Sequence, residues 1–114
     1  MYDIHRFAKP EHRQLSADIY AWADQIPGLS YFYDSGDIFA CLMSYGFTLC
    51  DYATDTGVPV PATLGFRRGL GGSDTDSPEY QTIRDANPAP ETVAAMLDAF
   101  HALIERTDSA GLSY

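Results

Sequence analysis

Apolar residues recur at helical spacing in three separate segments of the chain. The first segment places four large apolar side chains on one face of a helix: Leu15, Ile19, Trp22 and Ile26. Pro10 suits the opening turn of this helix, and Pro27-Gly28 stops it. The pattern therefore predicts a helix over residues 10–26.

The second segment carries two complementary stripes with the same helical period. Its apolar stripe consists of Ile38, Leu42, Tyr45, Leu49 and Tyr52, and its polar stripe consists of Asp37, Ser44, Thr48, Asp51 and Asp55. Asp34 or Ser35 can cap the start, and Gly57 can end the helix. We predict a largely buried helix over about 36–54. Gly46 lowers its helix propensity by about 1 kcal/mol relative to Ala, and a glycine at this position favours a close helix crossing.

The aromatic-rich segment 30–53 also admits a second interpretation. Residues 31–33 could pair with a following strand across Asp34-Ser35-Gly36-Asp37, in a hairpin or meander, and the fold would then be α+β. The strict alternation of apolar and polar residues that a strand requires is not found, so the helix is the preferred interpretation.

The clearest helical pattern lies near the end of the chain. It predicts a helix over residues 90–106 that buries Val93, Met96, Leu97, Phe100, Leu103 and Ile104. A short helix through Ser77–Asp85 is predicted by its start, in which Ser77 caps, Pro78 takes the first helical position and Glu79 lies in the first turn. Another short turn is expected from Pro61, and a glycine-rich loop over residues 67–73.

These elements predict a mainly α protein with a single domain over residues 1–114. A chain of 114 residues with 46% hydrophobic residues is long and apolar enough for one core. Residues 1–10 lack the apolar stretch of a signal peptide, and no apolar run reaches the length of a membrane span. Cys41 and Cys50 are the only cysteines. We therefore expect a cytoplasmic protein with reduced thiols and no membrane association.

The charge of the chain is strongly negative and unevenly distributed. The net charge is −9 at pH 7, with 16 Asp and Glu against 7 Lys and Arg. Residues 14–66 contain no Lys or Arg, and a second acidic run follows Arg67-Arg68. Direct binding to nucleic acid or to an anionic membrane depends on basic residues, so neither is expected.

The sequence contains no motif that identifies a catalytic, metal or cofactor site. The two cysteines are spaced so that a helix would place them on opposite sides. His101 falls inside the last predicted helix, where we interpret it as a half-buried packing residue. An enzyme is therefore the less favoured class, and no catalytic residue, metal ligand or cofactor is predicted.

The favoured hypothesis is a small acidic protein that binds, and inhibits, a basic nucleic-acid-binding or nuclease-type protein, as in toxin immunity or phage anti-defence. A carboxylate array would occupy the positions of phosphates on such a partner. The predicted contact residues are Asp34, Asp37, Asp51, Asp55, Asp74, Asp76 and Glu79, with Tyr31 and Tyr33 as aromatic anchors. For Tyr45 and Tyr52 we expect core positions with the hydroxyl at the surface.

Two alternatives belong to other classes. A small enzyme or anionic-ligand-binding protein would hold its ligand with the loop residues Arg67, Arg68, Gly71, Gly72 and Ser73. A homodimeric structural protein would pair through apolar helix faces, with its acidic residues outside the interface.

Overall fold

The described part of the chain is built from helices. In a computed structural model, residues 10–29, 38–62, 64 and 77–111 are described. They contain four labelled helices, α1 (Pro10–Ala23), α2 (Ile38–Thr56), α4 (Pro78–Ala86) and α5 (Pro90–Ser109), and no strand. The predicted mainly α class is confirmed. The α+β alternative is wrong for residues 38–53, all of which are helical, and residues 30–37 lie outside the described residues.

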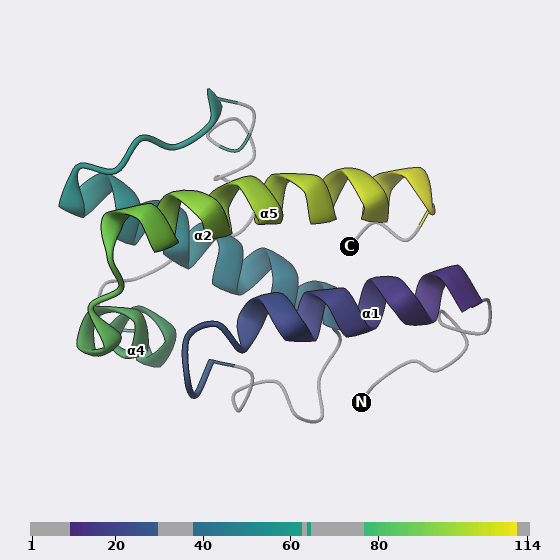
Figure 1. Cartoon of the computed structure of the whole chain (residues 1–114), viewed down its shortest axis with the longest axis horizontal. Coiled ribbons are helices and arrows are strands. Elements are labelled where there is room, and N and C mark those ends of the chain that lie inside the picture. Colours follow the sequence, from purple (N-terminus) through teal and green to yellow (C-terminus); the bar gives the residue numbers. More distant parts are fainter. Residues whose placement is uncertain (1–9, 30–37, 63, 65–76, 112–114) are drawn as a thin grey trace.

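Helix α2 is the central element of the fold. Figure 1 shows α1 and α5 side by side with opposite directions, while α2 passes behind both of them. Helix α4 packs against α2 at one end of the molecule. The core therefore lies where α1, α2 and α5 meet. None of the described helices is both long and apolar enough to cross a membrane.

The predicted apolar stripes form this core. Every described member of the three stripes is buried: Leu15, Ile19, Trp22, Ile26, Leu42, Tyr45, Leu49, Tyr52, Val93, Met96, Leu97, Phe100, Leu103 and Ile104. Tyr80 and Ile83 of α4 are buried as well. Local periodicity was sufficient here because each stripe faces a neighbouring helix.

Burial in α2 extends beyond its apolar stripe. Thr48 belongs to the predicted polar stripe, yet it is only 2% exposed, and its hydroxyl donates to the Ser44 carbonyl oxygen at 2.7 Å. Tyr45 is also more buried than predicted: its hydroxyl was expected at the surface, but the hydroxyl oxygen is buried along with the ring. A helix packed on several sides buries polar positions that its period alone assigns to solvent.

Phe100 of α5 lies at the crossing of three helices. Its ring packs directly over Gly46 of α2, where an added Cβ would overlap the ring atoms. The same ring stacks on Trp22 of α1 with centroids 5.6 Å apart and meets Phe47 edge-on at 5.4 Å. The Trp22 indole N–H donates across the interface to the Met96 carbonyl oxygen at 2.9 Å. The close crossing predicted from Gly46 is thus present.

The end of α2 and the start of α4 follow the predicted chemistry, whereas α1 ends at Ala23, three residues before its predicted end, and α5 ends at Ser109, three residues after its predicted end. Gly57, at φ +83°, ends α2 with two bonds to the last turn, Gly57 N–H to the Thr54 carbonyl at 3.3 Å and Val58 N–H to the Ala53 carbonyl at 2.8 Å. Ser77 Oγ accepts from Tyr80 N–H at 3.1 Å and caps α4. Leu64 N–H donates to the Pro61 carbonyl at 3.0 Å, within the short turn expected from Pro61.

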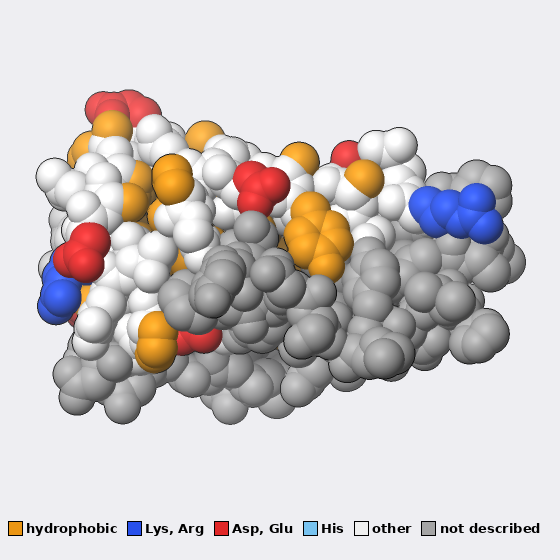
Figure 2. Space-filling view, turned by 90° about the horizontal axis from the view of Figure 1, so that it is seen from below, with side chains coloured by type: hydrophobic (Ala, Val, Ile, Leu, Met, Phe, Trp, Pro, Cys, Tyr) orange, Lys and Arg blue, Asp and Glu red, His pale blue; other side chains and the backbone are white. Residues whose placement is uncertain are grey.

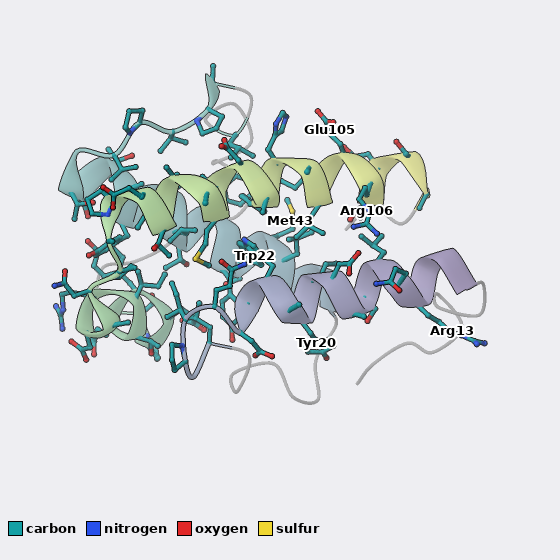
Figure 3. The ribbon with its side chains drawn as sticks, viewed as in Figure 1. Arg13, Tyr20, Trp22, Met43, Glu105 and Arg106 are labelled. Carbon is teal, nitrogen blue, oxygen red and sulfur yellow. The ribbon has the colours of Figure 1, made fainter. Side chains whose placement is uncertain are left out.

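One ion pair joins α1 to α5 at the surface. Figure 3 shows Arg106 pointing toward α1, where its Nη1 lies 2.8 Å from Asp18 Oδ2. Gln14 donates to the other oxygen of the same carboxylate at 2.8 Å. These two donors, Arg106 first, lower the pKa of Asp18 below its ordinary value.

We expect Gly46→Ala to lower the free energy of unfolding by about 1–2 kcal/mol. Overpacking of the core costs about 1–3 kcal/mol, and the overlap of an added Cβ with the Phe100 ring places the cost at about 2–3 kcal/mol, whereas the gain in helix propensity is only about 1 kcal/mol. Urea denaturation of Gly46→Ala, of Phe100→Leu and of the double variant measures the coupling. When Phe100→Leu is already present, the cost of Gly46→Ala should fall by at least half, and strict additivity would contradict the contact.

We expect Asp18→Asn to lose stability of about 0.2–1 kcal/mol at neutral pH, the range of an exposed ion pair. The lowered pKa means that this stability is present above the unfolded value of about 3.9 and is lost as pH falls through the folded value. Thermal denaturation from pH 7 to pH 2 should therefore show a shallower acid decline in the variant. Arg106→Gln removes the same pair and should show the same shallower decline. An unchanged acid profile in Arg106→Gln would contradict the assignment.

Candidate protein-binding surface

Three of the predicted contact residues fall in the described part of the chain. Asp51 and Asp55 lie on α2, half-buried and exposed respectively, and the half-buried Glu79 lies in the first turn of α4. The other predicted residues lie outside the described residues: Tyr31, Tyr33, Asp34, Asp37, Asp74, Asp76 and, for the alternative anion site, Arg67, Arg68, Gly71, Gly72 and Ser73.

A hydrogen bond joins α2, which carries Asp55, to α4, which carries Glu79. The Tyr80 hydroxyl donates to Asp55 Oδ2 at 2.6 Å, and the Tyr80 ring meets Tyr52 edge-on with centroids 6.0 Å apart. Glu79 precedes Tyr80 on α4. The carboxylates of Asp55 and Glu79 therefore belong to one end of the molecule, although they come from separate acidic runs of the sequence.

The Asp55 carboxylate has a structural role as well as a surface position. Its hydrogen bond raises the pKa of Tyr80 above the ordinary tyrosine value, with burial as the second cause. A tyrosine with a raised pKa stays neutral and keeps donating throughout the neutral range. Asp55 is thus an anchor for α4 while it remains exposed to a partner.

The position of Asp55 in α2 is electrostatically unfavourable for the helix. The C-terminal end of a helix carries partial negative charge, which favours cations there and disfavours carboxylates. Asp55 lies in the last turn of α2, and that turn contains no basic residue. The Tyr80 hydroxyl donates a hydrogen bond to this carboxylate.

A further group of acidic residues lies on α5 and was not among the predicted contact residues. Its exposed members are Glu91, Asp98, Glu105 and Asp108. The sequence did contain a signal for three of them, because residues 91, 98 and 105 follow each other at intervals of seven within a predicted helix. The apolar residues of that helix predict which side is buried. They give no role to the acidic residues on the opposite side.

Carboxylates far outnumber cations among the described side chains. Ten carboxylates are described, Asp18, Asp24, Asp51, Asp55, Glu79, Asp85, Glu91, Asp98, Glu105 and Asp108, against three arginines, Arg13, Arg84 and Arg106. Arg84 lies 3.7 Å from Asp85 and Arg106 lies 2.8 Å from Asp18, so two of the three arginines already face a carboxylate. The described surface therefore has a negative field of its own.

The carboxylates are unevenly distributed over this surface. On the face shown in Figure 2, the acidic side chains stand singly and apart, with basic side chains at the two ends. On α5, Glu105 points away from α1, opposite to its neighbour Arg106 (Figure 3).

Histidine and metal-ligand chemistry adds little to the described surface. His101 is half-buried, as the sequence suggested, and its Nε2 lies 3.1 Å from Glu105 Oε1 one turn along α5. No group of three His, Cys, Asp or Glu side chains within the described ranges is arranged to hold a metal ion.

We expect Tyr80→Phe to lower the free energy of unfolding by about 0.5–1.5 kcal/mol, the net contribution of one hydrogen bond. Asp55→Asn keeps an acceptor for the same hydroxyl and should cost less. Chemical denaturation at pH 7 measures both. Above about pH 10, wild-type stability should fall as Tyr80 deprotonates through its raised pKa, and this alkaline decline should be weaker in Tyr80→Phe. A variant with wild-type stability and the wild-type alkaline profile would contradict the anchoring role.

In comparisons of the chain with protein families, curated proteins and solved structures, no match is found.

Proposed function

We propose that this protein is a non-enzymatic binder of a basic protein, and that its surface carboxylates make the contact. The partner class is a nucleic-acid-binding or nuclease-type protein, because its phosphate-binding surface carries the required lysines and arginines. A bound carboxylate surface would exclude nucleic acid from those residues and so inhibit the partner. Toxin immunity and phage anti-defence are settings in which such an inhibitor acts.

The observation that carries this proposal is the placement of carboxylates at helix ends whose dipole favours cations. Asp55 lies in the last turn of α2, and Asp108 lies in the last turn of α5. Both positions oppose the helix dipole, and each carboxylate there costs the helix a few tenths of a kcal/mol or more, by the same interaction that stabilises cations. At Asp55 the hydrogen bond from Tyr80 offsets this cost. Carboxylates at the negative ends of two helices add to the local negative field, which favours a basic partner and supports a role in binding.

The surplus of carboxylates over arginines supports the proposal independently. A negative field accelerates association with a positively charged partner and disfavours anionic ones. With two of the three described arginines facing carboxylates of the same chain, little local charge opposes that field. The interaction should consequently be strongest at low ionic strength.

The test begins with affinity capture from an extract of the native host, using the full chain as bait. We expect a basic protein to be retained at about 50 mM NaCl and released at about 500 mM, because salt shortens the screening length from more than 10 Å to a few ångströms. The captured protein is then purified, and its binding to nucleic acid is measured with and without the chain. We expect the chain to compete with nucleic acid.

Two variants separate charge from general surface effects. The first replaces six carboxylates by amides at Asp24, Glu79, Asp85, Glu91, Asp98 and Glu105, and it should bind the purified partner at least about tenfold more weakly. The matched control replaces neutral exposed residues, Gln25→Ala, Gln81→Ala and Thr92→Ala, and should bind as wild type. Equal binding by wild type and the six-amide variant, or capture of no basic protein at low salt, would overturn the proposed function.

A further inference from the structure

Helix α4 is attached to the rest of the described structure mainly through α2. It packs against α2 at one end of the molecule, away from the place where α1, α2 and α5 meet (Figure 1). Tyr80 and Ile83 are the buried residues among its nine, whereas α5 buries seven. Thr82 lies beside Gly28 in the turn after α1, where an added Cβ would be 3.8 Å from its methyl group. Because buried apolar surface is the main source of helix stability in a folded protein, α4 is held less firmly than α5.

The connection between α4 and α5 interrupts the helical path. Asn87 adopts a left-handed conformation, at φ +47°, and its N–H donates back to the last turn of α4 at 3.0 and 3.1 Å. Pro88 and Pro90 follow, and neither has the backbone N–H that would continue α4 into α5. Residues 87–89 are exposed or half-buried. The two helices are therefore separate units, and α4 can unfold without unwinding the first turn of α5.

The described contacts between α4 and α2 converge on one side chain. The Tyr80 hydroxyl donates to Asp55 Oδ2 at 2.6 Å, and the ring of the same tyrosine meets Tyr52 edge-on. Arg84 pairs with Asp85 at 3.7 Å, so this ion pair lies within α4 and does not attach it to α2. A single tyrosine thus supplies both a polar and an aromatic contact with the last turns of α2.

We propose that α4 is a lid over the C-terminal part of α2, which opens as a unit while α1, α2 and α5 stay folded, and that the hydrogen bond from Tyr80 to Asp55 is its latch. Opening exposes the Tyr52 ring and frees the Asp55 carboxylate for other donors. The opened state keeps the contact of Phe100 with Gly46, because that contact lies between α5 and α2. This inference does not depend on the proposed function, since it concerns contacts within the chain.

Amide hydrogen exchange of the full chain, followed by NMR, measures the opening of each helix separately. Under conditions in which exchange reports the opening equilibrium, we expect the amides of residues 82–86 to share one protection factor, at least about tenfold below that of the slowest α5 amides. Low concentrations of guanidinium should change this value little, because the effect of denaturant scales with the surface that opening exposes. A gradual loss of protection from the helix ends inward would indicate fraying and would overturn opening as a unit.

Variants of the core distinguish opening of α4 from unfolding of the whole molecule. Gly46→Ala weakens a contact that the opened state retains. It should therefore speed exchange of the slowest α5 amides at least about fivefold and leave the α4 amides within about twofold of wild type. Asp18→Asn, which removes the surface pair between α1 and α5, should give the same pattern with smaller amplitude and replaces Gly46→Ala if that variant does not fold. Equal acceleration of both helices by either variant would show that α4 opens only with the whole molecule, and would overturn the lid.

Variants of the latch test the role of Tyr80. Tyr80→Phe and Asp55→Ala each remove the hydrogen bond and should speed exchange of the α4 amides about three- to tenfold. The double variant should add little to either single variant, since both remove the same bond. Asp85→Asn, which changes a carboxylate whose described ion pair lies within α4, is the control and should stay within about twofold of wild type. Unchanged exchange in Tyr80→Phe, or full additivity in the double variant, would overturn the latch.

Discussion

The contact between the Phe100 ring and the backbone of Gly46 is the constraint on which the rest of this structure depends. It lets α5 and α2 cross closely, and it places the ring where Trp22 of α1 can stack on one side and Phe47 can meet it edge-on. The indole hydrogen bond to the Met96 carbonyl then ties α1 to α5. Together with the other buried residues of α5, Phe100 faces α1 and α2, and Glu91, Asp98 and Glu105 are exposed.

The central burial of α2 determines where charge can lie. Most of α2 is surrounded by other helices, so its described carboxylates occur only near its C-terminal end, where Asp55 also holds α4 through Tyr80. Helix α5 keeps one side open along its whole length and can carry an uninterrupted row of carboxylates. Carboxylates are therefore few on α2 and more frequent on α5, because a buried carboxylate would need a compensating partner.

The helix ends that were predicted correctly are those that depend on residues close together in the sequence. Ser77, Pro78 and Glu79 mark the start of α4 through neighbours in sequence, and Gly57 ends α2 through its own backbone conformation. The end of α1 was predicted three residues late: the helix ends at Ala23, and Gln25 and Ile26 continue it only as a tighter turn, with bonds of 3.2 and 3.4 Å to residues three back. Ile26 is buried although it lies beyond the end of α1. Its apolar character therefore did not indicate where the helix ends.

By itself, the sequence determined the helices, their apolar faces and the excess of negative charge, because each of these follows from residue type and spacing along the chain. Only the tertiary structure decided that Thr48 and the Tyr45 hydroxyl are buried, that Asp18 pairs with Arg106, and that Asp55 accepts a hydrogen bond from Tyr80. These outcomes depend on which helix packs against which face and at what distance. A pattern with a period of one helical turn contains no information about a partner many residues away.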